Sequence, residues 1–177
     1  MLGQFDKPDT GPGHNGKRIM VLGVGNILLK DEGVGVRVVE RMRDDYDFAP
    51  DIELMDGGTA GFDLLAYIDG VDHLIIVDTV KTGEPPGSIF RFTPNDINIK
   101  VPYKTSLHQI GLVEVFAVAE ALGNKIEAVI IGVQPEDMYS IDLELTPTIA
   151  ARVPDIIELV IRELEAVGVR VAPKRSA

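Results

Sequence analysis

Residues 18–37 read RIMVLGVGNILLKDEGVGVR, and this stretch decides the fold. It opens with an apolar run long enough for a buried strand, which a glycine turn then ends. Two adjacent acids, Asp31 and Glu32, follow the turn, and apolar residues spaced four apart over 34–42 predict a helix behind them. The pattern therefore places carboxylates at the carboxyl end of a strand, where open α/β sheets bind their ligands.

The rest of the chain alternates between strand-like and helix-like segments. Strands are predicted over 18–24, 52–55, 73–77, 88–92 and 128–133, the fourth as an antiparallel edge. Helices are predicted over 31–46, with Asp31 as N-cap, and over 61–69. A third helix is predicted to follow a capping box at Ser106–Gln109, and a last one to begin at Thr146-Pro147, with a restart or kink at Pro154. This alternation predicts an α/β fold, a three-layer αβα sandwich around a twisted, mostly parallel sheet of about five strands.

The length of 177 residues fits one domain with a substantial core. Residues 1–17 are rich in Gly, Pro and polar residues, which predicts a disordered N-terminal tail. We therefore expect a single domain over residues 18–168, followed by a C-terminal tail over residues 169–177.

Charge and cysteine content exclude several functional classes. The net charge of −11 argues against nucleic acid or an anionic membrane as a partner, because both require a basic surface. The absence of cysteine excludes disulfides, thiolate zinc sites and a cysteine nucleophile. No apolar stretch reaches the length of a membrane span and the first residues lack the apolar core of a signal peptide, so we expect a cytoplasmic protein.

Two nucleotide-binding motifs and one catalytic motif are absent. The glycine turn begins as a dinucleotide fingerprint does, but Leu28 stands where the third glycine belongs. No Gly-Lys-Ser/Thr sequence supports a phosphate loop, and Ser88 lacks the flanking pattern of a nucleophile elbow. A tight turn after the strand explains the glycines without any ligand.

Three acids and one histidine lie at the ends of predicted elements. Glu32 follows the first strand, Asp56 and Asp78 end the second and third, and His108 opens a helix. If these strands are parallel, the acids share one edge of the sheet, and the long loop before His108 can return there. Two carboxylates and an imidazole suit a borderline divalent ion such as nickel or zinc and leave a coordination position open.

A simpler interpretation needs no metal. Asp31 and Glu32 suit the N-cap and first turn of a helix, and Asp78 suits the start of a turn. His73, beside Asp72, is interpreted as an entry residue of its strand.

Five sequence blocks resemble the hydrogenase maturation endopeptidases, which trim the C-terminus of the large subunit of [NiFe] hydrogenases. The blocks keep their order and separation from about Arg18 to about Gly168. They are VLGVGNILLKDEGVGVR (21–37), LMDGGTAG (54–61), DHLIIVD (72–78), SLHQIGL (106–112) and LTPTI (145–149).

The resemblance implies a metal site and a substrate. Glu32, Asp78 and His108 match the family's metal ligands, and Asp56 matches an aspartate of its D-G-G-T-x-G block. The metal is expected to be nickel already bound in the precursor of the large subunit, which the protease reads as a recognition handle. Glu32, Asp78 and His108 would hold this ion and so place the scissile bond beside it. Asp56 would orient a ligand or accept a proton. Whether a separate zinc-type metal takes part is left open.

Two functions are therefore expected for this protein, in order of preference. The first is an endopeptidase that acts on the precursor, as a monomer. The second is a non-catalytic nickel-binding accessory protein that docks on the precursor without cutting it.

Overall fold

The computed structural model describes residues 16–96 and 115–174. Its centre is a five-stranded sheet in the order β3-β1-β4-β6-β5, in which β1 lies between β3 and β4. The four strands β3, β1, β4 and β6 are parallel, and β5 runs antiparallel to β6 at the edge. The strands span Ile19–Val24 (β1), Glu53–Gly58 (β3), His73–Thr79 (β4), Ile89–Phe92 (β5) and Glu127–Val133 (β6).

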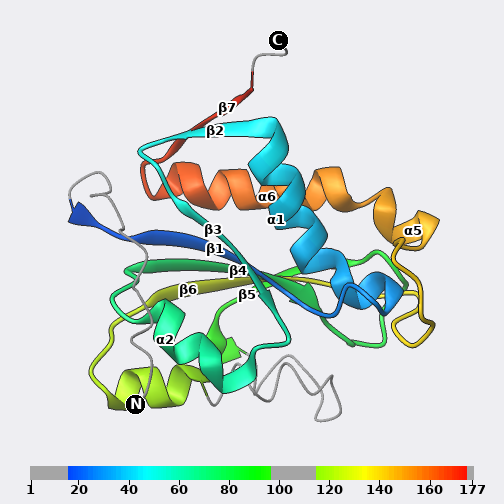
Figure 1. Cartoon of the computed structure of the whole chain (residues 1–177), viewed down its shortest axis with the longest axis horizontal. Coiled ribbons are helices and arrows are strands. Elements are labelled where there is room, and N and C mark those ends of the chain that lie inside the picture. Colours follow the sequence, from blue (N-terminus) through cyan, green and yellow to red (C-terminus); the bar gives the residue numbers. More distant parts are fainter. Residues whose placement is uncertain (1–15, 97–114, 175–177) are drawn as a thin grey trace, which may run out of the picture.

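Helices cover both faces of this sheet (Figure 1). Helices α1 (Val34–Asp45) and α6 (Val153–Ala166) lie on one face, and α2 (Leu64–Ile68) lies on the other together with a helical segment at residues 115–121. Three-residue 3-10 turns, η3 (Gly61–Asp63) and η4 (Pro94–Asp96), complete the connections. The predicted α/β architecture with a mostly parallel sheet of five strands is confirmed.

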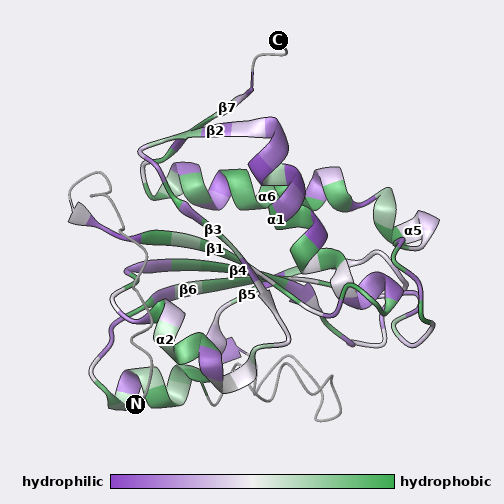
Figure 2. Cartoon of the chain, in the orientation of Figure 1, coloured by the Kyte–Doolittle hydropathy of each residue, from purple (hydrophilic) through white to green (hydrophobic). Residues whose placement is uncertain are grey.

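Two apolar cores lie on the two faces, because side chains of a strand alternate between them. In β1, Ile19 and Val21 pack under α1 and α6, whereas Met20 and Leu22 pack toward α2. Every residue of β1 and β4 is buried, as expected of parallel strands covered on both faces. Figure 2 shows the same pattern as apolar strands and as helices with one apolar side.

The register aligns the carboxyl ends of three strands. Gly23 of β1 pairs with Asp56 of β3 on one side and with Val77 of β4 on the other. Asp56 and Asp78 therefore lie at the same edge of the sheet.

The start of the first helix differs from the prediction. Residues Lys30–Gly33 form a separate 3-10 turn, η2, and α1 begins only at Val34 with Gly33 as its N-cap. No side chain caps either element, so the prediction that Asp31 is an N-cap was wrong. The predicted cap at the last helical region is confirmed, since Thr146 Oγ1 accepts a hydrogen bond from Ile149 N, 3.4 Å away. The predicted restart is confirmed too, because α5 (Pro147–Ala150) and α6 are separate helices.

A second, two-stranded sheet was not predicted. Strand β2 (Tyr46–Ala49) pairs antiparallel with β7 (Arg170–Pro173) beyond the end of α1 (Figure 1). The expected C-terminal tail over residues 169–177 therefore contains a strand, and Val169 is part of the core under α6. An exposed four-residue strand has too little apolar alternation to be recognised without its partner.

Two predictions fall outside the described residues. They are the tail up to residue 15 and the capping box at Ser106–Gln109 with His108. Within the described ranges, no helix combines the length and the apolar character needed to cross a lipid bilayer.

Candidate functional site

The connection from β1 to α1 folds back tightly onto the strand ends. Gly25 has φ +131°, and a Cβ atom there would lie 1.7 Å from the carbonyl oxygen of Glu32. A Cβ atom on Gly35 would lie 2.1 Å from the carbonyl oxygen of Val77. Only glycine permits these close backbone contacts, because any side chain would clash. Gly25 and Gly35 therefore allow the connection to pack against the strand ends, which places Glu32 near the end of β4.

Asp78 is the buried carboxylate at this end of β4. Its side chain is 1% exposed, and Oδ1 accepts a hydrogen bond of 2.7 Å from Thr79 N. Oδ2 is also buried, and no hydrogen-bond partner for it exists among the residues that the structure describes. A buried carboxylate oxygen without a donor is costly, which makes this oxygen a candidate ligand atom.

A negative charge on Asp78 is unfavourable at this position because the side chain is buried. Burial raises the pKa of Asp78 to about 8, the hydrogen bond from Thr79 N opposes the rise, and the carboxylate of Glu32 adds to it. Glu32 is itself only 8% exposed. Two adjacent buried acids can share a proton or bind a cation, and a cation would relieve both the burial and the repulsion.

Asp31 has a different role from its neighbour. Its buried carboxylate accepts four hydrogen bonds from a loop more than 100 residues away in the sequence. Oδ1 accepts from Thr146 N (2.8 Å), and Oδ2 accepts from Thr146 Oγ1 (3.0 Å), Glu136 N (3.0 Å) and Asp137 N (2.9 Å). Asp31 therefore fixes the loop over residues 134–146 beside the site, a role that no local pattern in the sequence indicates.

Asp56 reaches the predicted edge but is not beside Asp78. It pairs with Gly23, which pairs in turn with Val77, so β1 separates the two acids by two strand spacings, roughly 10 Å. The alternation of side chains also directs Asp78, one residue beyond Val77, to the opposite face of the sheet. Asp56 is exposed, and its Oδ1 accepts a hydrogen bond of 2.8 Å from Gly58 N.

The third predicted ligand, His108, lies outside the described residues, so its relation to Asp78 and Glu32 stays a prediction. Among the residues that are described, no group of three His, Asp or Glu side chains could hold a metal ion. The pair formed by Glu32 and Asp78 fits an ion in its chemistry, since both are oxygen donors and one donor atom is unpartnered, but it needs further ligands.

A pocket of about 560 Å³ lies at the other end of the sheet, near the start of β4 and β6. Its charged side chains are largely paired with one another. Arg91 donates hydrogen bonds of 2.6 and 2.9 Å to Glu163, and His73 Nδ1 lies 3.1 Å from a carboxylate oxygen of Glu127. This agrees with the interpretation of His73 as a strand-entry residue, and the candidate site remains at the carboxyl edge.

Comparison with known families identifies one match over most of the chain. The family model HycI, described as hydrogenase maturation protease, matches residues 36–163.

Curated relatives are similar over nearly the whole chain. The hydrogenase 2 maturation protease of Escherichia coli is 37% identical over 161 residues, which cover 90% of this chain and 98% of the relative. The hydrogenase expression/formation protein HupD of Rhodobacter capsulatus is 36% identical over 162 residues, which cover 90% of this chain and 77% of the relative.

Solved structures share the fold. The hydrogenase maturating endopeptidase HybD from E. coli superimposes with a TM-score of 0.82 at 37% identity, covering 89% of this chain and 98% of that one. The [NiFe] hydrogenase maturation protease HybD from Thermococcus kodakarensis, at 22% identity and a TM-score of 0.69, shares the fold.

Proposed function

Since this chain belongs to the hydrogenase maturation protease family, we propose that it is an endopeptidase acting on the large-subunit precursor of a [NiFe] hydrogenase. In this proposal it removes a C-terminal peptide from the nickel-loaded precursor, and Glu32, Asp78 and His108 bind the nickel. The ion arrives with the substrate. A resident divalent ion such as zinc is not required by the proposal.

The single observation that carries the proposal is the buried pair at the end of β4. Asp78 is almost fully buried with one oxygen unpartnered within the described part of the chain, and Glu32 lies next to it in the fold. Structural acids in cores are normally satisfied by donors, as Asp31 is. A buried carboxylate with one oxygen that accepts no hydrogen bond, beside a second buried acid, is typical of a site that receives a cation.

The residues of the chain have distinct roles in this proposal. Glu32 and Asp78 supply oxygen ligands and His108 a nitrogen ligand, so that the precursor is held with its scissile bond at the carboxyl edge of the sheet. Nickel bound there supplies a Lewis acid for the scissile carbonyl or for a water molecule. Asp56 is exposed at the same edge, two strand spacings from Asp78, and its proposed role is to accept a proton from water rather than to orient a metal ligand. We also propose that the protein works as a monomer in the cytoplasm.

The test is a mass spectrum of the precursor after incubation with this protein, with nickel loaded or absent. We expect loss of a C-terminal peptide only from the nickel-loaded precursor. Cleavage regardless of nickel would refute the role of nickel in recognition. Tight nickel binding without any cleavage of a cognate, loaded precursor would favour the accessory protein instead.

Variants test the site itself. Glu32→Gln and Asp78→Asn keep the shape of the side chain but remove a negative ligand, so each should reduce the cleavage rate by about 10- to 100-fold or more. Glu165→Gln is the matched control, because this exposed acid lies in the last turn of α6, remote from the site. Full cleavage by either site variant would refute the assignment.

A further inference from the structure

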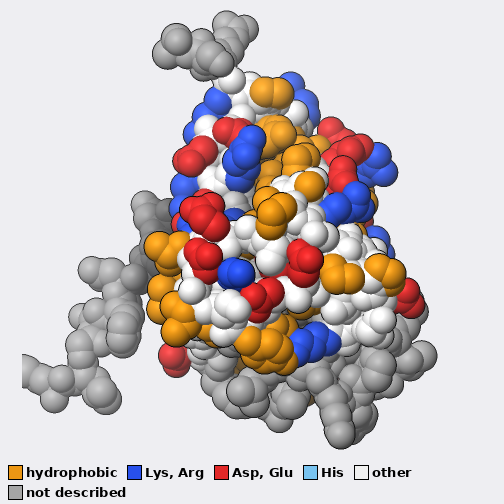
Figure 3. All heavy atoms as spheres, turned by 90° about the vertical axis from the view of Figure 1, so that its right-hand side faces the viewer, with side chains coloured by type: hydrophobic (Ala, Val, Ile, Leu, Met, Phe, Trp, Pro, Cys, Tyr) orange, Lys and Arg blue, Asp and Glu red, His pale blue; other side chains and the backbone are white. Residues whose placement is uncertain are grey.

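The described residues expose seven large hydrophobic side chains, and four of them lie in two loops beside the candidate site. They are Leu28 (54% exposed), Tyr139 (75%), Ile141 (87%) and Leu143 (53%). We call these four residues the loop patch. Figure 3 faces this side of the molecule and shows hydrophobic side chains at the surface among charged ones. Such clustering on one face is typical of an interaction surface rather than of scattered exposure.

The two loops that carry the patch are joined to each other. Asp142 N donates to Leu28 O (3.0 Å), and Lys30 N donates to Asp142 O (3.0 Å), so the loops pair like a short parallel ladder. Arg37 donates a hydrogen bond of 2.9 Å to Leu143 O. The exposed side chains therefore project from backbone that is already ordered.

Further contacts hold the centre of the patch. Lys81 Nζ lies 4.4 Å from the centroid of the Tyr139 ring. Asp137 Oδ1 accepts hydrogen bonds from Tyr139 N (3.0 Å) and Ser140 N (3.1 Å). Asp31 anchors the base of the same loop through the four hydrogen bonds described above. A surface ordered before binding loses less conformational entropy when a partner docks.

The patch is continuous with the candidate site. Leu28 is separated from Glu32 by a single turn, in which Glu32 N donates to Leu29 O (3.0 Å). Asp31 N donates to Asp137 O (3.1 Å), which joins that turn to the other loop. The loop patch therefore lies next to the position of a molecule bound at Glu32 and Asp78.

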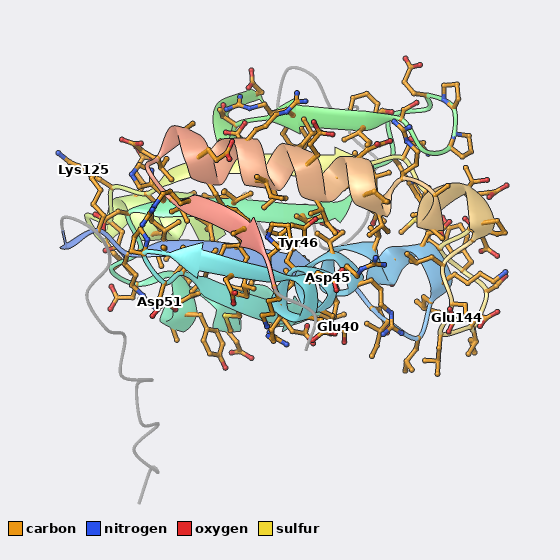
Figure 4. All side chains as sticks on the ribbon, turned by 90° about the horizontal axis from the view of Figure 1, so that it is seen from above. Glu40, Asp45, Tyr46, Asp51, Lys125 and Glu144 are labelled. Atoms are coloured by element: carbon orange, nitrogen blue, oxygen red, sulfur yellow. The ribbon has the colours of Figure 1, made fainter. Side chains whose placement is uncertain are left out.

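The charge around the patch defines the chemistry of the partner. Residues 134–144 contain four acids and neither lysine nor arginine, and three of the acids, Glu136, Asp142 and Glu144, are exposed. Glu144 lies at the end of the molecule remote from Lys125 (Figure 4).

The cations near the loop patch are already paired, since Lys30 lies 3.3 Å from Asp137 and Lys81 lies over the ring of Tyr139. An apolar surface rimmed by acids fits a surface with apolar side chains flanked by lysine or arginine.

We propose that the loop patch docks the folded precursor next to its scissile bond, through an apolar segment with basic neighbours. This inference rests on the proposed function and extends it from the site to the recognition surface. The patch sets how tightly the precursor binds, and the acids around it set how fast the precursor associates. The chemistry at Glu32 and Asp78 is left unchanged by the patch.

The test is the double variant Ile141→Ser/Leu143→Ser, assayed for cleavage of the nickel-loaded precursor by mass spectrometry over a range of precursor concentrations. We expect KM to rise about tenfold or more while kcat stays within about twofold, because only uniform binding is lost. The matched control is Leu122→Ser, which removes a side chain that is 72% exposed outside the patch. Because all three side chains are exposed, the variants should unfold at the temperature of the wild type.

A charge variant tests the rim separately. Asp142→Asn/Glu144→Gln should slow association of the precursor and weaken its dependence on salt concentration, with dissociation little changed.

The outcomes separate this inference from the proposed function. If the wild type cleaves the precursor and the double variant has an unchanged KM, the docking surface is refuted and the protease function stands. If the wild type binds the precursor without cleaving it and the double variant binds more weakly, the protease function fails and the docking surface stands. If the double variant instead abolishes a dimer of this chain with no change in precursor affinity, the patch is a self-association surface and the inference is refuted.

Discussion

Asp31→Ala is the substitution for which the structure gives the clearest expectation. It removes the carboxylate that accepts four hydrogen bonds and leaves their donors in place. Two of these donors, Thr146 N and Thr146 Oγ1, are buried, whereas the backbone N–H groups of Glu136 and Asp137 are partly accessible to water. The two buried donors lose their partner without compensation.

The magnitude follows from these two donors. Each buried polar group left without a partner costs about 1–3 kcal/mol, so we expect Asp31→Ala to lower the free energy of unfolding by roughly 3–4 kcal/mol. That is a large share of the ~5–15 kcal/mol that stabilises a typical domain. Asp31→Asn keeps one acceptor oxygen but turns an amide N–H₂ toward donors, so about half of the loss, roughly 2 kcal/mol, is expected.

The assay is equilibrium unfolding in urea at pH 7, followed by circular dichroism with a chelator present. With a urea dependence of about 2 kcal/mol per molar, Asp31→Ala should lower the midpoint by roughly 1.5–2 M. The control is Asp45→Ala, which removes only an exposed partner of Arg41 at the end of α1. The reasoning is refuted if Asp31→Ala shifts the midpoint no further than Asp45→Ala does.

Three other substitutions or truncations test separate features. Burial disfavours ionised Asp78 only in the folded state, so the folded protein keeps the proton on this carboxyl up to about pH 8. The free energy of unfolding of the metal-free protein should therefore fall by a few kcal/mol between pH 4 and pH 8, relative to that of Asp78→Asn. If urea unfolding gives parallel pH profiles for the two proteins, this expectation is contradicted. Gly35→Ala should destabilise the protein by about 1–3 kcal/mol or more and abolish cleavage, because the new Cβ atom would lie 2.1 Å from Val77 O. A melting temperature equal to that of the wild type would refute this close approach. Ending the chain at Val169 removes β7 and its four pairs with β2, so thermal unfolding should show a loss of about 1–2 kcal/mol, and no change would mean that the small sheet contributes nothing.

The sequence alone was sufficient for the main elements of the fold. The unbroken apolar runs of β1, β4 and β6 predicted buried parallel strands, and the Thr146-Pro147 pair predicted where α5 begins. These signals are local, because burial on both faces and a helix cap are written in neighbouring residues. The sequence also predicted that Asp56 and Asp78 share one edge of the sheet, since parallel strands end together.

Only the tertiary structure decided how the acids at that edge differ. Asp31 and Glu32 are adjacent in the sequence, yet one is saturated by donors from a loop more than 100 residues away and the other lies beside the buried Asp78. The pairing of β2 with β7 and the separation of Asp56 from Asp78 by β1 likewise depend on partners remote in the chain. A carboxylate's partners and burial are properties of its surroundings in space, and residue type and spacing encode neither until the chain has folded.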